Sequence, residues 1–169
     1  MEQAVFISYS SEDKAAADQV CAVLEGAGYG CWMAPRDIEP GADYPTAILN
    51  GLQRSRALVV IVTSTAVASP HVLSEIGHAF GEKKPIIPFR ISTAPLPPKF
   101  DYFLSMSQWL DAPDGCTARN LSHLQEAVSQ ALAGGTVEIV SAKRKPDKRI
   151  PLAGAGILRQ DRRDPASLL

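Results

Sequence analysis

One stretch, residues 58–81, most limits what this chain can fold into, because it holds a single formally charged residue, Glu75. It overlaps residues 57–62 (ALVVIV), a continuous run of aliphatic, mostly β-branched side chains. Such a run is typical of a strand that is buried on both faces in the middle of a parallel sheet. Residues 63–69 are small and polar, as expected for a loop that leaves the carboxyl end of that strand.

A helix is predicted to follow this loop. Ser69 provides an N-cap and Pro70 suits the first helical position. Glu75 borders the apolar face of this helix, just outside the carboxyl ends of the strands, where open α/β sheets place ligands. A carboxylate at such a border is usually a solvated flanking residue or a partner of the helix dipole, so the rest of the chain has to decide its role. The predicted core face consists of Val72, Leu73, Ile76, Ala79 and Phe80.

The remaining pattern alternates strands with helices. Prolines at 85 and 88 suggest that the fourth strand lies near an edge of the sheet. Alternation with short connections implies right-handed crossovers and a parallel sheet that is covered by helices on both faces. Strands are predicted at 4–8, 29–33, 57–62, 85–91 and 107–111, and helices at 11–27 (capped by Ser11, with Ala15 and Ala16 opening its buried stripe), 44–55, 70–81 and 117–133.

Charge divides the 169 residues into two parts. Residues 1–140 carry nine Lys and Arg against fifteen Asp and Glu, a net charge of −6, whereas residues 141–169 carry eight against three, a net charge of +5. Helical or strand periodicity fails beyond Gly135. The sequence therefore predicts a folded domain over residues 1–134 and a basic, disordered tail or linker over residues 135–169.

Several other classes of protein are disfavoured. No apolar run approaches the ~20 residues of a membrane span, and no signal peptide precedes the first strand. Three cysteines without CxxC spacing favour reduced thiols and a cytoplasmic location. No nucleic-acid partner is expected, although the basic tail carries the charge for one.

Two apparent ligand motifs are set aside. Gly26, Gly28 and Gly30 are spaced like a dinucleotide fingerprint, but they end a helix, and Cys31 takes the place of the third glycine. His71, Glu75 and His78 share a helical stripe that can in principle ligate zinc. That arrangement would sequester the candidate catalytic carboxylate, so we expect no metal.

Three short motifs in order give the chain a resemblance to a Toll/interleukin-1 receptor (TIR) domain of the bacterial, NAD-cleaving kind. They are residues 6–9 (FISY) on the first strand, the long loop within residues 32–41, and residues 72–76 (VLSEI). The resemblance covers about residues 3–133. It implies a flavodoxin-like three-layer α/β fold with a five-stranded parallel sheet.

The same resemblance implies an activity. Many TIR domains cleave NAD⁺ between nicotinamide and ribose with one glutamate, which corresponds to Glu75; NAD⁺ is then the substrate, and no cofactor is expected. Some members carry arginines where this chain has Ser10 and Ser11. The substrate-binding residues implied are Ser8, Tyr9, Ser10 and Ser11 on the nucleotide side, Trp32 at the strand end, and Glu39 and Gly41 in a loop that covers the ligand or meets a neighbour.

One carboxylate suits this reaction. Nicotinamide leaves as a neutral molecule, so no general acid is needed, and a carboxylate in a dry cleft stabilises the positive charge that develops on the ribose. Orientation of a ribose hydroxyl and nucleophilic attack remain alternative roles for Glu75. The product stays open between linear ADP-ribose, a cyclic isomer and another signal.

The resemblance further implies homotypic assembly through the 34–43 loop, a sensor domain or partner chain, and a role in antiphage defence or virulence. The rival prediction is a non-catalytic adaptor that acts only through contacts between TIR domains.

Overall fold

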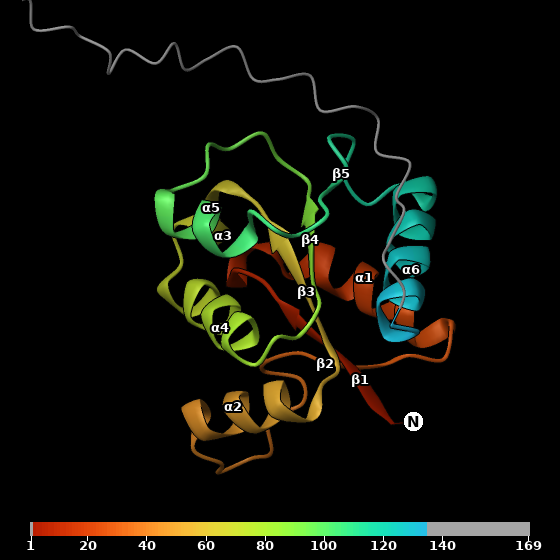
Figure 1. Ribbon diagram of the computed structural model, residues 1–169. Coiled ribbons are helices and arrows are strands. Elements are labelled where there is room, and N and C mark those ends of the chain that lie inside the picture. Colours follow the sequence, from red (N-terminus) through yellow and green to blue (C-terminus); the bar gives the residue numbers. More distant parts are fainter. Residues whose placement is uncertain (1, 135–169) are drawn as a thin grey trace, which may run out of the picture.

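The computed structural model describes residues 2–134, which form one five-stranded parallel sheet with the strand order β2-β1-β3-β4-β5 (Figure 1). The predicted three-layer α/β fold is confirmed. The strands are β1 (Gln3–Ser8), β2 (Gly30–Trp32), β3 (Ala57–Val62), β4 (Ile86–Arg90) and β5 (Leu110–Asp111). The helices are η1 (Ser11–Asp13), α1 (Lys14–Gly26), α2 (Tyr44–Arg54), α3 (Ser64–Val67), α4 (Pro70–Gly81), α5 (Pro98–Leu104) and α6 (Ala118–Leu132).

The central strand β3 has the predicted bounds, and all six of its residues are buried. It pairs with β1 on one side and β4 on the other. Its side chains alternate between two cores: Val59 and Ile61 join the core beneath α1 and α6, while Leu58, Val60 and Val62 join the core beneath α2, α4 and α5. Burial on both faces explains why this strand lacks polar residues.

Helix α4 begins where the sequence predicts. The Ser69 hydroxyl accepts a hydrogen bond from the Val72 amide at 3.3 Å, and Pro70 is the first helical residue. The predicted core residues Val72, Ile76 and Ala79 are buried, but Phe80 is 39% exposed. Phe80 packs instead on the outer edge of the core, where its ring centroid lies 5.2 Å from that of Phe103 in α5.

The start of the first helix was predicted wrongly, and so was the loop after β3. Ser11 does not cap an α-helix; it opens the short turn η1, and α1 starts only at Lys14. The Asp13 carboxylate accepts hydrogen bonds from the Thr63 hydroxyl at 2.5 Å and the Thr65 hydroxyl at 3.0 Å. These bonds hold the end of η1 against a one-turn helix, α3, within the predicted loop.

The buried stripe of α1 also differs from the predicted one. Ala15 is exposed and Ala16 only partly buried, because the helix face that packs against the sheet is centred on other residues. The residues of α1 that are buried are Ala17, Val20, Cys21 and Leu24.

Strand β4 lies one strand in from the edge, beside the two-residue strand β5. The amide of Leu58 donates to the carbonyl oxygen of Pro85, and the amide of Ile91 donates to the carbonyl oxygen of Val62. The backbone amide and carbonyl groups of odd-numbered residues in β4 therefore point towards β3. Pro88 therefore faces the side of β5, whose pairing reaches only Phe89 and Arg90. A proline at this position removes no hydrogen bond from the sheet.

The predicted tail over residues 135–169 lies outside the described residues, so the domain boundary stays a prediction. Within the described part of the chain, no helix has both the length and the apolar character that crossing a membrane requires.

Candidate functional site

Glu75 lies in the second turn of α4 beside the carboxyl end of β1. Ser8, the last residue of β1, is 1% exposed, and its hydroxyl donates a hydrogen bond to the Glu75 carboxylate. Glu75 itself is half-buried at the margin of the apolar face of α4. The fold thus places this carboxylate at the carboxyl ends of the strands, where open α/β proteins bind ligands.

The surroundings of Glu75 change its acidity. Burial raises the pKa of the carboxyl group to about 7, and the hydrogen bond from Ser8 opposes this rise because it favours the charged form. Near neutral pH the group is therefore divided between its protonated and ionised forms. A carboxyl group with such a pKa at a cleft is a candidate functional residue.

A cavity of about 230 Å³ opens beside this carboxylate. Among the twelve described residues that line it, Glu75 is the one acidic residue, and none is Lys or Arg. Hydroxyl groups and one imidazole supply the other polar atoms. The lining residues are Phe6, Ile7, Tyr9, Ser10, Ser11, Ala34, Pro35, Tyr44, Ile48, Ser69, His71 and Glu75.

Tyr9 ties two walls of the cavity together. Its hydroxyl donates a hydrogen bond to the carbonyl oxygen of Ala34, the first residue of the long loop after β2. Partial burial raises the pKa of this phenol, so Tyr9 remains a neutral donor at physiological pH. The bond holds the beginning of the loop against the carboxyl end of β1.

The structure brings together some of the predicted site residues. Tyr9, Ser10, Ser11 and Glu75 line the cavity, whereas Ser8 lies buried behind Glu75 and contacts it directly.

Trp32, Glu39 and Gly41 lie elsewhere. The Trp32 ring stacks on Phe6 with centroids 5.0 Å apart, and a Cβ atom on Gly51 of α2 would lie 2.5 Å from the indole ring. The Trp32 side chain is only 8% exposed. Trp32 and Glu39 both border a separate, polar cavity of about 270 Å³, and Gly41 is an exposed loop residue with φ +82°.

Sequence reasoning missed several lining residues. Tyr44 and Ile48 reach the cavity from the first turns of α2, and Ser69 from the start of α4. His71 was considered only as a metal ligand; it precedes Glu75 by four residues and so lies one turn earlier on the same face. That spacing was the one available signal for it.

The described residues contain one group with metal-ligand geometry, but it excludes Glu75. Ligand atoms of Cys21, Glu25 and Cys31 lie within 4.8 Å of one another. The Arg36 guanidinium already donates to Cys21 Sγ at 2.8 Å and to the Glu25 carboxylate at 2.9 Å. A cationic side chain thus occupies the place that a metal ion would take.

Comparison with known proteins agrees with this architecture. The family model for the TIR domain matches residues 5–128. This chain belongs to the TIR domain family. The match spans β1 through most of α6 and therefore contains the whole Glu75 cavity. A search of curated proteins finds no match to this TIR domain.

Solved structures similar to this TIR domain include receptors and an enzyme. The TIR domain of a Toll-related receptor from Hydra magnipapillata has a TM-score of 0.62 and 21% identity, over 76% of this chain and 97% of that one. A TIR-STING receptor from C. gigas has a TM-score of 0.59 and 20% identity, over 74% of this chain and 39% of that one. A CMP N-glycosidase from Clostridium botulinum has a TM-score of 0.55 and 14% identity, over 74% and 99%. At these identities the likeness is one of fold.

Proposed function

We propose that this TIR domain cleaves the bond between nicotinamide and ribose in NAD⁺, with Glu75 as the catalytic carboxylate. The observation that carries the proposal is the position of Glu75, a half-buried carboxylate that Ser8 holds at the wall of a cavity. Among the described residues that line this cavity there is no other carboxylate and no Lys or Arg. A carboxylate that is partly shielded from water and has no neighbouring charge to compete with it interacts strongly with a cationic ligand. NAD⁺ presents its positive charge on the nicotinamide ring, next to the bond to be cleaved.

The chemistry requires little else. When the C1′–N bond breaks, its electron pair goes to nicotinamide, which leaves as a neutral molecule without protonation. The positive charge moves to the ribose, where the ionised Glu75 stabilises it. Water then supplies a hydroxyl to C1′ and releases a proton, giving ADP-ribose; attack by a group of the adenine on C1′ gives a cyclic isomer instead.

The comparisons support the reaction type but not the substrate. The C. botulinum protein is named a CMP N-glycosidase, so a similar fold carries an enzyme that acts on an N-glycosidic bond of a nucleotide. Its 14% identity transfers no residue roles. The support for nicotinamide release therefore comes from Glu75 and its surroundings.

The rival function, a non-catalytic adaptor, is favoured by one observation. None of the described residues that line the cavity is Lys or Arg, so the described lining offers no fixed cation for the pyrophosphate of NAD⁺. TIR domains generally assemble with one another, and we propose that a neighbouring copy contributes to the complete site. For either function we propose a biological role in antiphage defence or in virulence.

The decisive experiment measures free nicotinamide after the purified protein is incubated with NAD⁺. We expect Glu75→Gln to lower turnover by at least about a hundredfold, the ~2.7 kcal/mol scale of one lost electrostatic stabiliser. Glu126→Gln, an isosteric change on the exposed side of α6, is the matched control and should retain full activity. If folded Glu75→Gln keeps most of the parent activity, the assignment of Glu75 is wrong; no nicotinamide release by assembled parent protein would favour the adaptor.

A further inference from the structure

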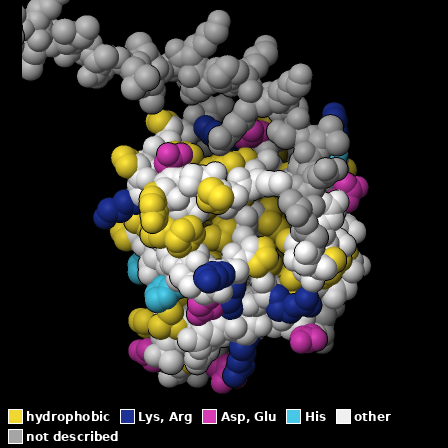
Figure 2. All heavy atoms as spheres, in the orientation of Figure 1, with side chains coloured by type: hydrophobic (Ala, Val, Ile, Leu, Met, Phe, Trp, Pro, Cys, Tyr) yellow, Lys and Arg dark blue, Asp and Glu magenta, His cyan; other side chains and the backbone are white. Residues whose placement is uncertain are grey.

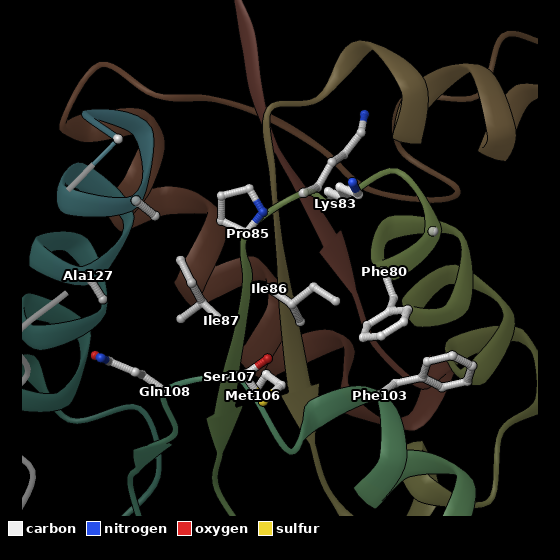
Figure 3. A pocket seen from close by; sticks show the side chains of 14 residues that line it. Phe80, Lys83, Pro85, Ile86, Ile87, Phe103, Met106, Ser107, Gln108 and Ala127 are labelled. Carbon is white, nitrogen blue, oxygen red and sulfur yellow. The ribbon is translucent and has the colours of Figure 1, made fainter. Parts of the chain in front are cut away.

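A second, largely apolar hollow of the described domain lies at the opposite end of the sheet from the Glu75 cavity. A groove of about 700 Å³ lies at the amino end of β4, between α4 and α5 on one side and α6 on the other. Figure 2 shows hydrophobic side chains gathered over this part of the molecule. In Figure 3, Ile86 and Ile87 lie along the middle of the groove, with Ala127 on one wall and Phe80 and Phe103 on the other.

The groove lies along an edge of the sheet that the described residues leave unpaired. β5 pairs only with Phe89 and Arg90, so no strand of residues 2–134 pairs with the amino-terminal half of β4 on that side. The alternation along β4 directs the amide and carbonyl of Ile86 towards this open side, because the odd-numbered residues face β3. An open edge flanked by apolar walls is the type of site to which an extended segment adds as a further strand.

The chain itself reaches the groove. Gly134, which follows α6 with φ +74°, is one of the residues that line it. A glycine with positive φ after a helix lets the chain reverse direction. Gly134 and Pro85, which precedes β4, line the same groove, so a chain that turns back at Gly134 can run along β4 in the parallel sense.

The first residues of the segment predicted above as a disordered tail nevertheless have the composition of a strand. Residues 136–140 (TVEIV) contain four β-branched side chains among five, and Val137 and Ile139 fall on one face. Extended, these residues span about 17 Å. The small side chains of Ala127 and Ala131 on α6 leave room for branched residues, and the exposed Lys83 beside the groove suits Glu138 in charge.

We propose that residues 136–140 of this same chain bind in the groove as an additional strand beside the amino-terminal half of β4. The segment lies beyond residue 128, where the match to the TIR family model ends, so the strand would be an addition to the family's sheet. The inference does not depend on the proposed function, because the groove and the Glu75 cavity share no lining residue.

Hydrogen exchange of the full chain, read by mass spectrometry, tests the proposal. We expect the amides of 136–140 to exchange at least about tenfold more slowly than the same sequence does as a free peptide, as hydrogen-bonded strands do. The double change Val137→Asp with Ile139→Asp should remove this protection. Ile150→Asp with Leu152→Asp, which makes the same chemical change later in the tail, should leave it intact.

A substitution in the groove tests whether the protection of residues 136–140 comes from docking or from the segment alone. Met106 lines the groove and is 88% exposed, so its replacement should leave the domain folded. Met106→Asp should speed exchange of 136–140 several-fold, whereas Met106→Leu should not. Exchange at the free-peptide rate in the parent protein would overturn the proposal. So would protection that grows with protein concentration, because the segment would then occupy the groove of a second copy.

Discussion

Two neighbouring residues at the end of β1 have different tasks at the cavity. Ser8 points inward and donates its hydroxyl to Glu75, whereas Tyr9 lines the cavity and donates to the loop at Ala34. If the domain has the proposed activity, Ser8 is a positioning residue, which acts only through the orientation and acidity of Glu75. Its hydrogen bond favours the ionised form and keeps the pKa of Glu75 lower than burial alone would make it.

This arrangement predicts a pH dependence. If ionised Glu75 stabilises the developing cation, kcat/KM for NAD⁺ should rise with pH and level off above a midpoint near the pKa of about 7 in the free protein. Ser8→Ala removes the bond that lowers this pKa, so the midpoint should move to higher pH. The measurement is a pH–rate profile of nicotinamide release. Ser10→Ala, next in the chain after Tyr9, is the control; an unchanged midpoint in Ser8→Ala would contradict the positioning role.

Among the structural elements, α2 is held at its carboxyl end by a residue distant in sequence. The Lys84 ammonium, just before β4, donates to the carbonyl oxygens of Leu52, Gln53 and Ser55 at 2.6–2.9 Å. Its side chain is only 13% exposed and also contacts Glu82 at 3.0 Å. A cation at a helix carboxyl terminus satisfies carbonyls that lack partners within the helix.

Replacement of this cation should destabilise the domain. Lys84→Met keeps the aliphatic length but removes the donors, and we expect a loss of about 2 kcal/mol in the free energy of unfolding. Lys99→Met, an exposed position on α5, should change it by less than about 0.5 kcal/mol. Urea unfolding followed by circular dichroism measures both, with the midpoint changing and the slope constant. Equal midpoints for the two variants would show that the Lys84 bonds contribute nothing net.

At the scale of the whole molecule, the proposed assembly depends on the loop over residues 34–43, which has a fixed base and an exposed tip. Arg36 anchors the base, donating to the Cys31 carbonyl oxygen at 2.7 Å and to Glu25 at 2.9 Å. Ile38 packs against the core beneath α2, so a charge there would disturb folding. Glu39 and Pro40 are exposed, which leaves them available to a neighbouring copy.

If assembly through this loop completes the site, activity should depend on concentration. We expect the rate of NAD⁺ cleavage to rise faster than linearly with protein concentration, so that the specific activity increases. The reason is that a neighbouring copy would supply a missing wall and exclude water. Glu39→Arg should abolish this rise without changing the thermal midpoint by more than a few degrees. Glu126→Arg, the same charge reversal on α6, should leave it intact. Constant specific activity at all concentrations would show that a single copy holds a complete site.

The sequence by itself determined the elements whose signals are local. The bounds of β3 follow from six consecutive apolar residues, and the start of α4 follows from Ser69 and Pro70, which act within one helical turn. The parallel sheet follows from the order of such elements, and Glu75 could be placed at the border of α4 from helical spacing alone. The family match over residues 5–128 confirmed the TIR resemblance that three short motifs carried.

Only the tertiary structure decided what depends on residues far apart in the chain. α1 starts later than predicted, in a region where Asp13 accepts hydrogen bonds from Thr63 and Thr65, fifty residues or more away. Trp32 packs against Phe6 and Gly51, and no spacing in the sequence reveals these contacts. The acidity of Glu75 is set by burial and by Ser8, 67 residues earlier. A pKa depends on the solvent and charges around a group in space, and these exist only once β1 and α4 have packed together.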